Sequence, residues 1–224
     1  MFEAVIFDCD GCLVETEAVS VEMELSALAG LGLTYARDDY VARFMGGTMA
    51  HWLEAVGADS QARLGAGLPR GFYDQLRADV RAAYDERLFA VEGAAAAAAR
   101  LHLRKAVASS SSDDHLKHVL DLTGLWDLFA PHVYSAHAVP RGKPAPDIYL
   151  YAASKLGCDP TRCLAIEDSA NGVRAAVAAG METWGFVGGG HLSSADAERL
   201  LAAGASRVVE HWTEAEELFL AWRT

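Results

Sequence analysis

The feature that most constrains the fold is an alternation of short apolar runs with segments of helical pattern. Residues 4–7 form a continuous apolar run, as expected of a strand that is buried on both faces of a sheet. Similar runs occur at residues 105–108, 163–166 and 183–187, with weaker candidates at 132–134 and 207–209. Segments with a helical pattern lie between them, at residues 94–103, 114–122, 147–156 and 171–179. This alternation predicts an α/β fold with a parallel sheet and helices on both faces.

One long segment departs from the alternation. Residues 15–88 contain helical patterns alone, which we place at residues 17–29, 37–44, 49–56 and 72–88. A helical block between the first and second strands indicates an inserted domain. We therefore expect a Rossmann-like core made of residues 1–14 and 89–224, and an α-helical cap domain made of residues 15–88.

The charge balance excludes some classes of partner. The chain of 224 residues carries a net charge of −12, which would repel the dense phosphate backbone of a nucleic acid. A small anionic substrate remains compatible, because a bound metal and local cations set the field inside a site. The first residues lack a basic region, and the longest run of one residue, 94–99, is far too short for a membrane span. We expect a cytoplasmic protein with no membrane association.

Acidic residues follow two of the predicted strands directly. Asp8 and Asp10 come after the first strand, two positions apart, so that they project to the same side. Glu167 and Asp168 follow the strand at 163–166. Because ligands bind beyond the carboxyl ends of parallel strands, these acids indicate an oxygen-rich site for Mg²⁺. Two close carboxylates stay ionised only beside a cation, and Asp10 is expected to have a raised pKa suited to acid–base work.

Two other strand ends carry groups that bind phosphate. The run Ser109 to Ser112 offers hydroxyls and backbone N–H groups at the end of the strand at 105–108. Lys143 lies between a glycine and a proline, and the proline holds it in an extended segment before a helix. Taken singly, the serines are equally typical of a loop or helix cap, and the lysine of a solvated turn.

The order of these motifs along the chain is distinctive. It runs from Asp-x-Asp-Gly at residues 8–11 to the serines at 109–112, Lys-Pro at 143–144 and Glu-Asp at 167–168. This arrangement resembles the haloacid dehalogenase superfamily of phosphotransferases over essentially the whole chain, including the place of the helical insertion. The sequence of residues 142–147 and 166–172 is similar to the corresponding motifs of the beta-phosphoglucomutase-like branch, which includes sugar-phosphate phosphatases.

The resemblance implies a mechanism and a set of roles. Asp8 would attack phosphorus and form an aspartyl-phosphate, while Asp10 would act as general acid and then as general base. Mg²⁺ would be held by Asp8, the carbonyl of Asp10 and Asp168, with Glu167 as a ligand or close neighbour. The transferring phosphoryl oxygens would be stabilised by Lys143, Ser109 and the backbone N–H of Ser110.

The expected activity is hydrolysis of small phosphorylated metabolites, such as a sugar phosphate or a sugar-acid phosphate. All four lysines lie outside residues 15–88, so a phosphonatase, which needs a cap lysine, is excluded, and Asp10 argues against a dehalogenase. A mutase of the beta-phosphoglucomutase type remains an alternative, although Ser20 stands where it would need a histidine. A catalytically silent binding protein is the alternative from another class.

The segment 43–48 resembles the substrate-specificity loop of related phosphatases. Gly46 and Gly47 would then contact substrate, and Arg43 either meets an anionic substrate group or is a solvated charge at a helix end. We expect a monomer or a weak homo-oligomer.

Other features have plainer interpretations. The four cysteines, at 9, 12, 158 and 163, have spacings compatible with zinc or redox chemistry but are better explained as packing. His115 and His118 are assigned to a solvated helix face, and Gly188 to Gly190 to a flexible loop. Glu15 departs from the aspartate common in the family and is expected to affect a hinge or a substrate contact.

Overall fold

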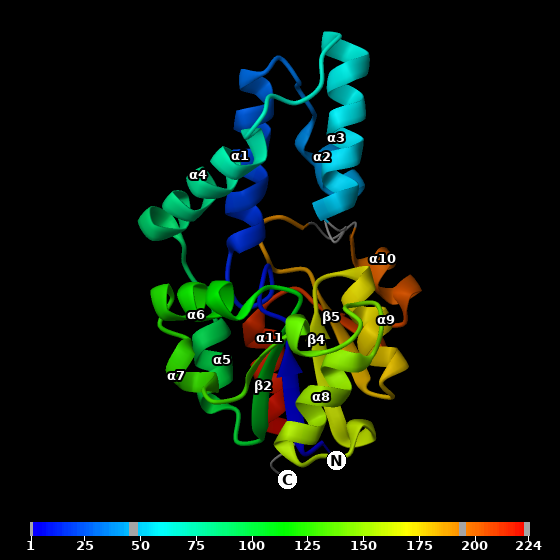
Figure 1. The fold of residues 1–224 in the computed structure, drawn as a ribbon. Helices are drawn as coiled ribbons and strands as arrows, with labels where there is room; N and C mark the ends of the chain where they lie inside the picture. The colour runs from blue at the N-terminus through cyan, green and yellow to red at the C-terminus, as the bar shows by residue number, and fades with distance from the viewer. Residues whose placement is uncertain (1, 45–48, 193–195, 222–224) are drawn as a thin grey trace. The chain divides into compact units, whose positions relative to one another are not determined.

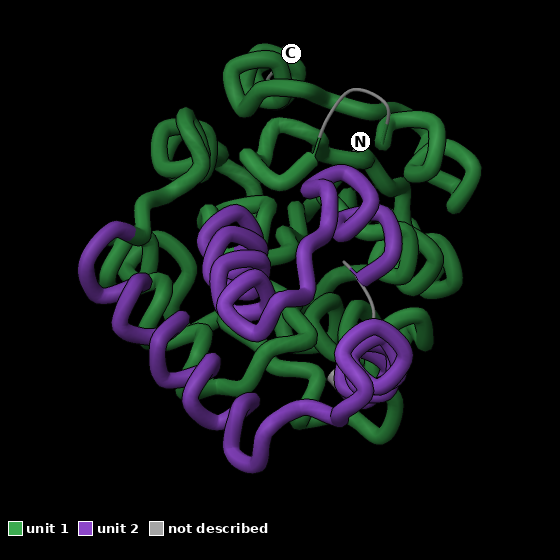
Figure 2. Tube along the Cα trace, turned by 90° about the horizontal axis from the view of Figure 1, so that it is seen from above, with its two compact units in different colours: residues 1–16, 88–224 green, residues 17–87 purple. Residues whose placement is uncertain are grey.

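A computed structural model describes residues 2–44, 49–192 and 196–221 of the chain. The described residues divide into two compact units (Figure 2). Unit 1 comprises residues 1–16 and 88–224, and unit 2 comprises residues 17–87.

Unit 1 contains a sheet of parallel strands, whose order within the described residues is β3-β2-β1-β4-β5-β6 (Figure 1). The strands are β1 (Ala4–Phe7), β2 (Arg104–Ser109), β3 (Val133–Ser135), β4 (Cys163–Glu167), β5 (Glu182–Phe186) and β6 (Arg207–Val209). Each strand predicted from an apolar run is present, and the predicted α/β fold is confirmed.

The helices of unit 1 lie on both faces of the sheet. They are α5 (Ala94–Arg100), α6 (Asp113–Leu122), α7 (Trp126–Phe129), α8 (Asp147–Leu156), α9 (Ala170–Ala178), α10 (Asp196–Ala203) and α11 (Trp212–Ala221), with short 3₁₀ turns at Ala136–Ala138 and Pro160–Arg162. Alternate residues of β1 serve the two faces, because successive strand side chains point in opposite directions. Ala4 and Ile6 pack with α8 and α9, whereas the ring of Phe7 contacts Phe129 and Trp212 on the other face.

The register of the central strands sets the position of the acidic residues. Phe7 of β1 lies opposite both Val107 of β2 and Ile166 of β4. The backbone N–H of Asp8 continues the ladder by donating to the carbonyl of Ile166 at 2.9 Å. Asp8, Ser109 and Glu167 therefore reach the same edge of the sheet, at the carboxyl ends of the strands.

Unit 2 is helical. It contains α1 (Thr16–Gly30, whose first residue belongs to unit 1), α2 (Arg37–Phe44), α3 (Met49–Leu64) and α4 (Phe72–Arg87). These helices enclose an apolar core of their own that includes Leu28, Leu33 and Tyr40. Across the described residues, no helix combines the length and the apolar character that crossing a membrane requires.

Two predicted helices end elsewhere than expected. Helix α3 continues through Gly57 to Leu64, because the buried Trp52, Val56 and Ser60 anchor it along one side and offset the cost of an internal glycine. Helix α5 stops at Arg100, since Leu101 adopts an extended conformation and turns into the core.

Candidate active site

A tight turn after β1 places Asp8 and Asp10 at the sheet edge. Gly11 has a φ of 77°, a left-handed conformation that glycine adopts without steric cost. The carbonyl of Cys9 accepts hydrogen bonds from the N–H groups of Leu13 and Val14, and the indole N–H of Trp212 donates to the carbonyl of Cys12 at 3.0 Å. The turn is thus held by the core beneath it.

The thiols of this turn point into the protein. Cys9 and Cys12 are fully buried, and this burial raises the pKa of both thiols well above the ordinary value. They pack as small hydrophobic side chains.

Three carboxylates from two strand ends meet beside this turn. One oxygen each from Asp8, Glu167 and Asp168 lies within 4.8 Å of the others, and all three side chains are buried. We call these residues the acid cluster. Asp8 and Asp168 were predicted to share a site from their positions after β1 and β4, and the structure brings them together.

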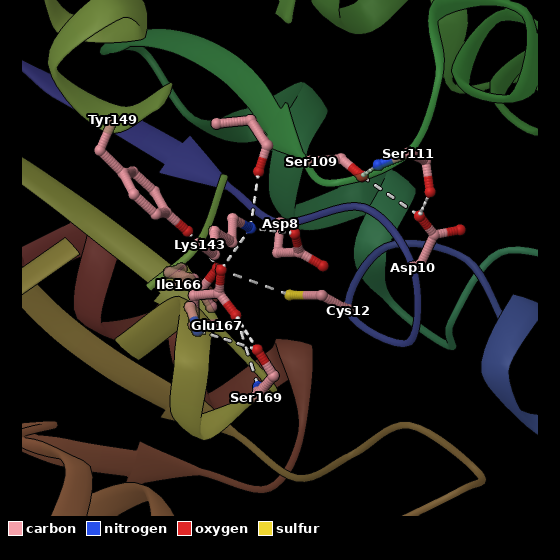
Figure 3. A network of polar contacts seen from close by, with 12 residues as sticks. Asp8, Asp10, Cys12, Ser109, Ser111, Lys143, Tyr149, Ile166, Glu167 and Ser169 are labelled. Atoms are coloured by element: carbon pink, nitrogen blue, oxygen red, sulfur yellow. Dashed lines mark hydrogen bonds and ion pairs between the residues drawn. The ribbon is translucent and has the colours of Figure 1, made fainter. Parts of the chain in front are cut away.

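Lys143 lies within the acid cluster (Figure 3). Its ammonium donates to Asp8 Oδ1 and Glu167 Oε1, each at 2.5 Å, and to the carbonyl of Ala108 at 3.0 Å. Burial alone would lower the pKa of Lys143, but the charges of Asp8 and Glu167 outweigh it and raise the pKa above the ordinary value. For Asp8, burial is the largest influence, and together with the neighbouring acids it raises the pKa despite Lys143.

Glu167 is held by its surroundings on several sides. The hydroxyl of Tyr149 donates to Oε1 at 2.5 Å, and that of Ser169 donates to Oε2 at 3.1 Å. Gly172 lies so close that a Cβ atom built there would be 1.9–2.0 Å from the carboxylate atoms of Glu167. The carboxylate therefore occupies space that only a glycine leaves open.

Asp10 faces away from the acid cluster and toward a set of donors (Figure 3). Oδ1 accepts from Thr16 Oγ1 and pairs with His115 Nε2, each at 2.8 Å, while Oδ2 accepts from the hydroxyls of Ser109 at 3.2 Å and Ser111 at 2.7 Å. Burial would raise the pKa of Asp10, but His115 and the hydroxyl donors outweigh it and lower the pKa.

The expected raised pKa of Asp10 is therefore wrong for this arrangement. The reason is that the carboxylate is surrounded by donors and not by the other acids. The carboxylate of Asp10 is also absent from the acid cluster as found among the described residues. The contribution of its backbone carbonyl to a metal site stays a prediction.

His115 was assigned to a solvated face, and this was wrong. It lies in the first turn of α6, and its ring reaches Asp10 because Ser112 caps the helix at the sheet edge. The i, i+3 spacing of His115 and His118 indicates a shared helix face but does not reveal which face is buried. The useful signal was the position of His115, three residues after the serine run.

The serines that follow β2 differ in the direction of their side chains. Ser109 and Ser111 point toward Asp10, and the carbonyl of Ser111 accepts from the hydroxyl of Ser135 at 2.6 Å. Ser110 is exposed. Its predicted contact with a phosphoryl group stays a prediction.

The loop after β5 also reaches the site. Its glycines had led to the prediction of a flexible loop. Gly190 N–H donates to Glu15 Oε2 at 2.9 Å, and His191 Nε2 lies 3.1 Å from Asp168 Oδ2. The glycine pattern in the sequence gave no sign of either contact.

The residues predicted to contact substrate in unit 2 are only partly described. Arg43 pairs with Asp59 through contacts of 2.6 and 3.1 Å, and its guanidinium lies over the ring of Phe44. Gly46 and Gly47 lie outside the described residues.

Comparison with known proteins identifies the class. Residues 2–180 match the haloacid dehalogenase-like hydrolase family. Because the match covers most of the chain, the protein belongs to this family, and the predicted resemblance is confirmed.

Two of the curated relatives are phosphatases by name. Hexitol phosphatase B of Escherichia coli K12 is 32% identical over 80% of this chain and 81% of its own length. The 6-phosphogluconate phosphatase of the same organism is 26% identical, over 84% of each chain. A solved haloacid dehalogenase family hydrolase from Deinococcus radiodurans, with bound phosphate and sodium, is 35% identical with a TM-score of 0.83, covering 96% of this chain and 93% of that one. The predicted enzyme class, a phosphoric monoester hydrolase of this superfamily, is thereby supported.

Proposed function

We propose that the protein is a Mg²⁺-dependent phosphatase that hydrolyses small phosphorylated metabolites through an aspartyl-phosphate on Asp8. The observation that carries the proposal is the acid cluster with Lys143 at the carboxyl edge of the sheet. A small phosphate ester is the substrate that such a combination of acids, an ammonium and hydroxyls suits best.

The acid cluster fits a divalent cation. Within the described residues, Lys143 pairs with two of its three buried carboxylates, Asp8 and Glu167, so that negative charge exceeds positive charge in a site of low dielectric. Its donors are all oxygens, the ligands that Mg²⁺ prefers. Asp8, Asp168 and the carbonyl of Asp10 would hold the ion, with Glu167 as a ligand or close neighbour. Bound there, Mg²⁺ would neutralise charge on the phosphoryl oxygens.

Asp8 is the nucleophile of the first step. A carboxylate oxygen of Asp8 forms a bond to phosphorus while the bond from phosphorus to the ester oxygen breaks. Asp10 acts as general acid toward the leaving oxygen, and an alcohol departs; because its donors lower its pKa in the arrangement described above, this role requires Asp10 to take up a proton when the substrate binds. Lys143 holds Asp8 Oδ1 at 2.5 Å and thereby fixes the direction of the carboxylate.

Water completes the second step. Asp10, now a carboxylate, takes a proton from water as the water oxygen bonds to phosphorus. The bond between phosphorus and Asp8 then breaks, which regenerates the carboxylate and releases phosphate. Thr16, Ser111 and His115 stabilise the ionised form of Asp10 that this step requires.

Unit 2 is proposed to select the substrate as a cap. Arg43, Gly46 and Gly47 would contact the part of the substrate that is not transferred. Ser109 and the backbone N–H of Ser110 would contact the phosphoryl group itself. We favour a sugar phosphate or sugar-acid phosphate, because the relatives named above include phosphatases of hexitols and of 6-phosphogluconate.

The test is release of inorganic phosphate from a panel of phosphorylated sugars, sugar acids and p-nitrophenyl phosphate. We expect turnover with Mg²⁺, loss with EDTA and recovery when Mg²⁺ is restored. Asp8→Asn should lose nearly all turnover while its circular dichroism spectrum stays that of the wild type. Metal binding without turnover of any ester would favour a silent binding protein. Conversion of beta-glucose 1-phosphate to the 6-phosphate without free phosphate would favour a mutase.

A further inference from the structure

The loop after β5, residues 187–192, brings a buried histidine to the acid cluster. The side chain of His191 is 3% exposed, and its Nε2 lies 3.1 Å from Oδ2 of Asp168. None of the steps above uses this ring. Its position beside a carboxylate of the acid cluster therefore calls for a function.

The loop holds this ring in one place through close contacts on both sides. A Cβ atom at Gly188 would lie 2.3 Å from the carbonyl oxygen of Glu210, and one at Gly189 would lie 2.3 Å from that of Gly11. Gly190 N–H donates to Oε2 of the buried Glu15 at 2.9 Å. Gly189 thus allows the loop to pack against the turn that follows β1, and Gly188 allows it to pack against the residue that follows β6.

The contact with Asp168 involves one nitrogen of the ring. Nε2 lies 3.1 Å from Oδ2, and an N–H at this nitrogen can donate to the carboxylate, whose oxygens accept hydrogen bonds. Nδ1 of His191 is buried and has no hydrogen-bond partner within the described part of the chain. It faces the backbone at Gly189, where a Cβ atom would be 3.0 Å away. The nitrogen that reaches the acid cluster is therefore occupied by Asp168.

We propose that His191 is a positioning residue that orients the carboxylate of Asp168 for a divalent cation. By engaging Oδ2, the ring restricts rotation of the carboxylate and leaves Oδ1 for the ion. Groups that orient metal ligands in this way contribute about 10–100-fold to metal affinity or activity. The inference rests on the proposed Mg²⁺ site and adds a role for the loop after β5. Glu15 supports it by fixing the loop.

The experiment compares His191→Gln with His191→Met. Both replacements are unbranched and similar in size, but Gln retains an N–H donor and Met does not. Binding of Mg²⁺ alone is measured by titration calorimetry, and binding of Mn²⁺ by electron paramagnetic resonance. We expect Met to weaken binding by about 10–100-fold and Gln to recover most of the loss. The same pair of substitutions at His132, whose Nδ1 bonds to the hydroxyl of Tyr134, is the control and should leave binding unchanged.

The two proposals fail in different ways. If the wild-type protein binds neither ion, the metal site itself is wrong, and the role of His191 falls with it. If the wild type binds and the Gln and Met variants match each other, the inference about His191 alone is wrong. Thermal melting shows that each variant is folded. Should Met at position 191 prevent folding, His191→Leu and His191→Asn provide the same contrast between a variant without a donor and one with a donor.

Discussion

Replacing Gly172 with Ala tests how tightly the carboxylate of Glu167 is confined. In most helices this change stabilises the protein by about 1 kcal/mol, because Ala has the better helix propensity. Here the new Cβ would lie 1.9–2.0 Å from three atoms of the Glu167 carboxylate. Atoms cannot approach so closely, so Glu167 or the start of α9 must move.

The magnitude follows from the bonds that Glu167 makes. Its Oε1 accepts from Lys143 and Tyr149, and each bond to a charged group contributes about 1.5–3 kcal/mol. Loss of both, offset by about 1 kcal/mol from helix propensity, leaves a destabilisation of about 3 kcal/mol. For a chain of this size that corresponds to a fall in Tm of roughly 6–12 °C. A shift of about 1 Å in the site would also reduce turnover by about 100-fold.

Gly57→Ala is the matched control for this experiment. Gly57 lies within helix α3, and no atom lies within 4 Å of a Cβ built there. We expect this variant to melt at or above the wild-type temperature and to keep full activity. Circular dichroism melts and phosphate release would be measured for both variants. If Gly172→Ala behaves like Gly57→Ala in both assays, the confinement of Glu167 is refuted.

Three further predictions concern buried charges. Lys143→Met leaves two buried carboxylates without their ammonium, so chemical denaturation without added metal should show a loss of about 3–5 kcal/mol; an unchanged midpoint would contradict the pairing. His115→Phe removes a donor to Asp10, and steady-state phosphate release should fall about tenfold, whereas wild-type turnover would exclude a contribution from this contact. Burial raises the pKa of Glu24 from 4.5 to about 7 in the folded protein. As pH rises across this interval, Glu24 ionises in the unfolded chain while it stays neutral in the folded protein, so the free energy of unfolding falls. Glu24→Gln should therefore gain stability over the wild type, by up to roughly 3 kcal/mol, between pH 4 and pH 8, and a difference that stays constant across melts in this range would argue against the shift.

Much of the fold was predictable because its signals are local. The apolar run at residues 4–7 could belong only to a buried segment, and acids directly after such a run must lie at the sheet edge. Asp8, Glu167 and Asp168 were found in this way, since Glu167 is the last residue of β4 and the other two directly follow β1 and β4. Lys143 was assigned to the site from the order of the motifs along the chain, since the Lys-Pro pair taken singly is typical of a solvated turn.

The residues that were missed depend on packing between distant segments. Whether His115 faces solvent or Asp10 is set by the rotation of α6, which helical spacing does not specify. His191 reaches Asp168 because its loop packs on Gly11 and Glu15, which are more than 170 residues earlier in the chain. No motif in the sequence marks Tyr149, and only the structure shows its hydroxyl on Glu167.

The strand order explains why the residues of the site come from such distant segments. From β1 the chain proceeds to β2 and β3 on one side, and then crosses to β4, β5 and β6 on the other. The connections therefore leave β1 and β4 in opposite directions, and the carboxyl edge between two such strands is where open α/β sheets bind ligands. Asp8 lies at the end of β1, Glu167 at the end of β4, and Lys143 arrives on the segment that crosses between the two halves. Because this topology requires a crossing segment, a cation carried on it can reach both carboxylates at once.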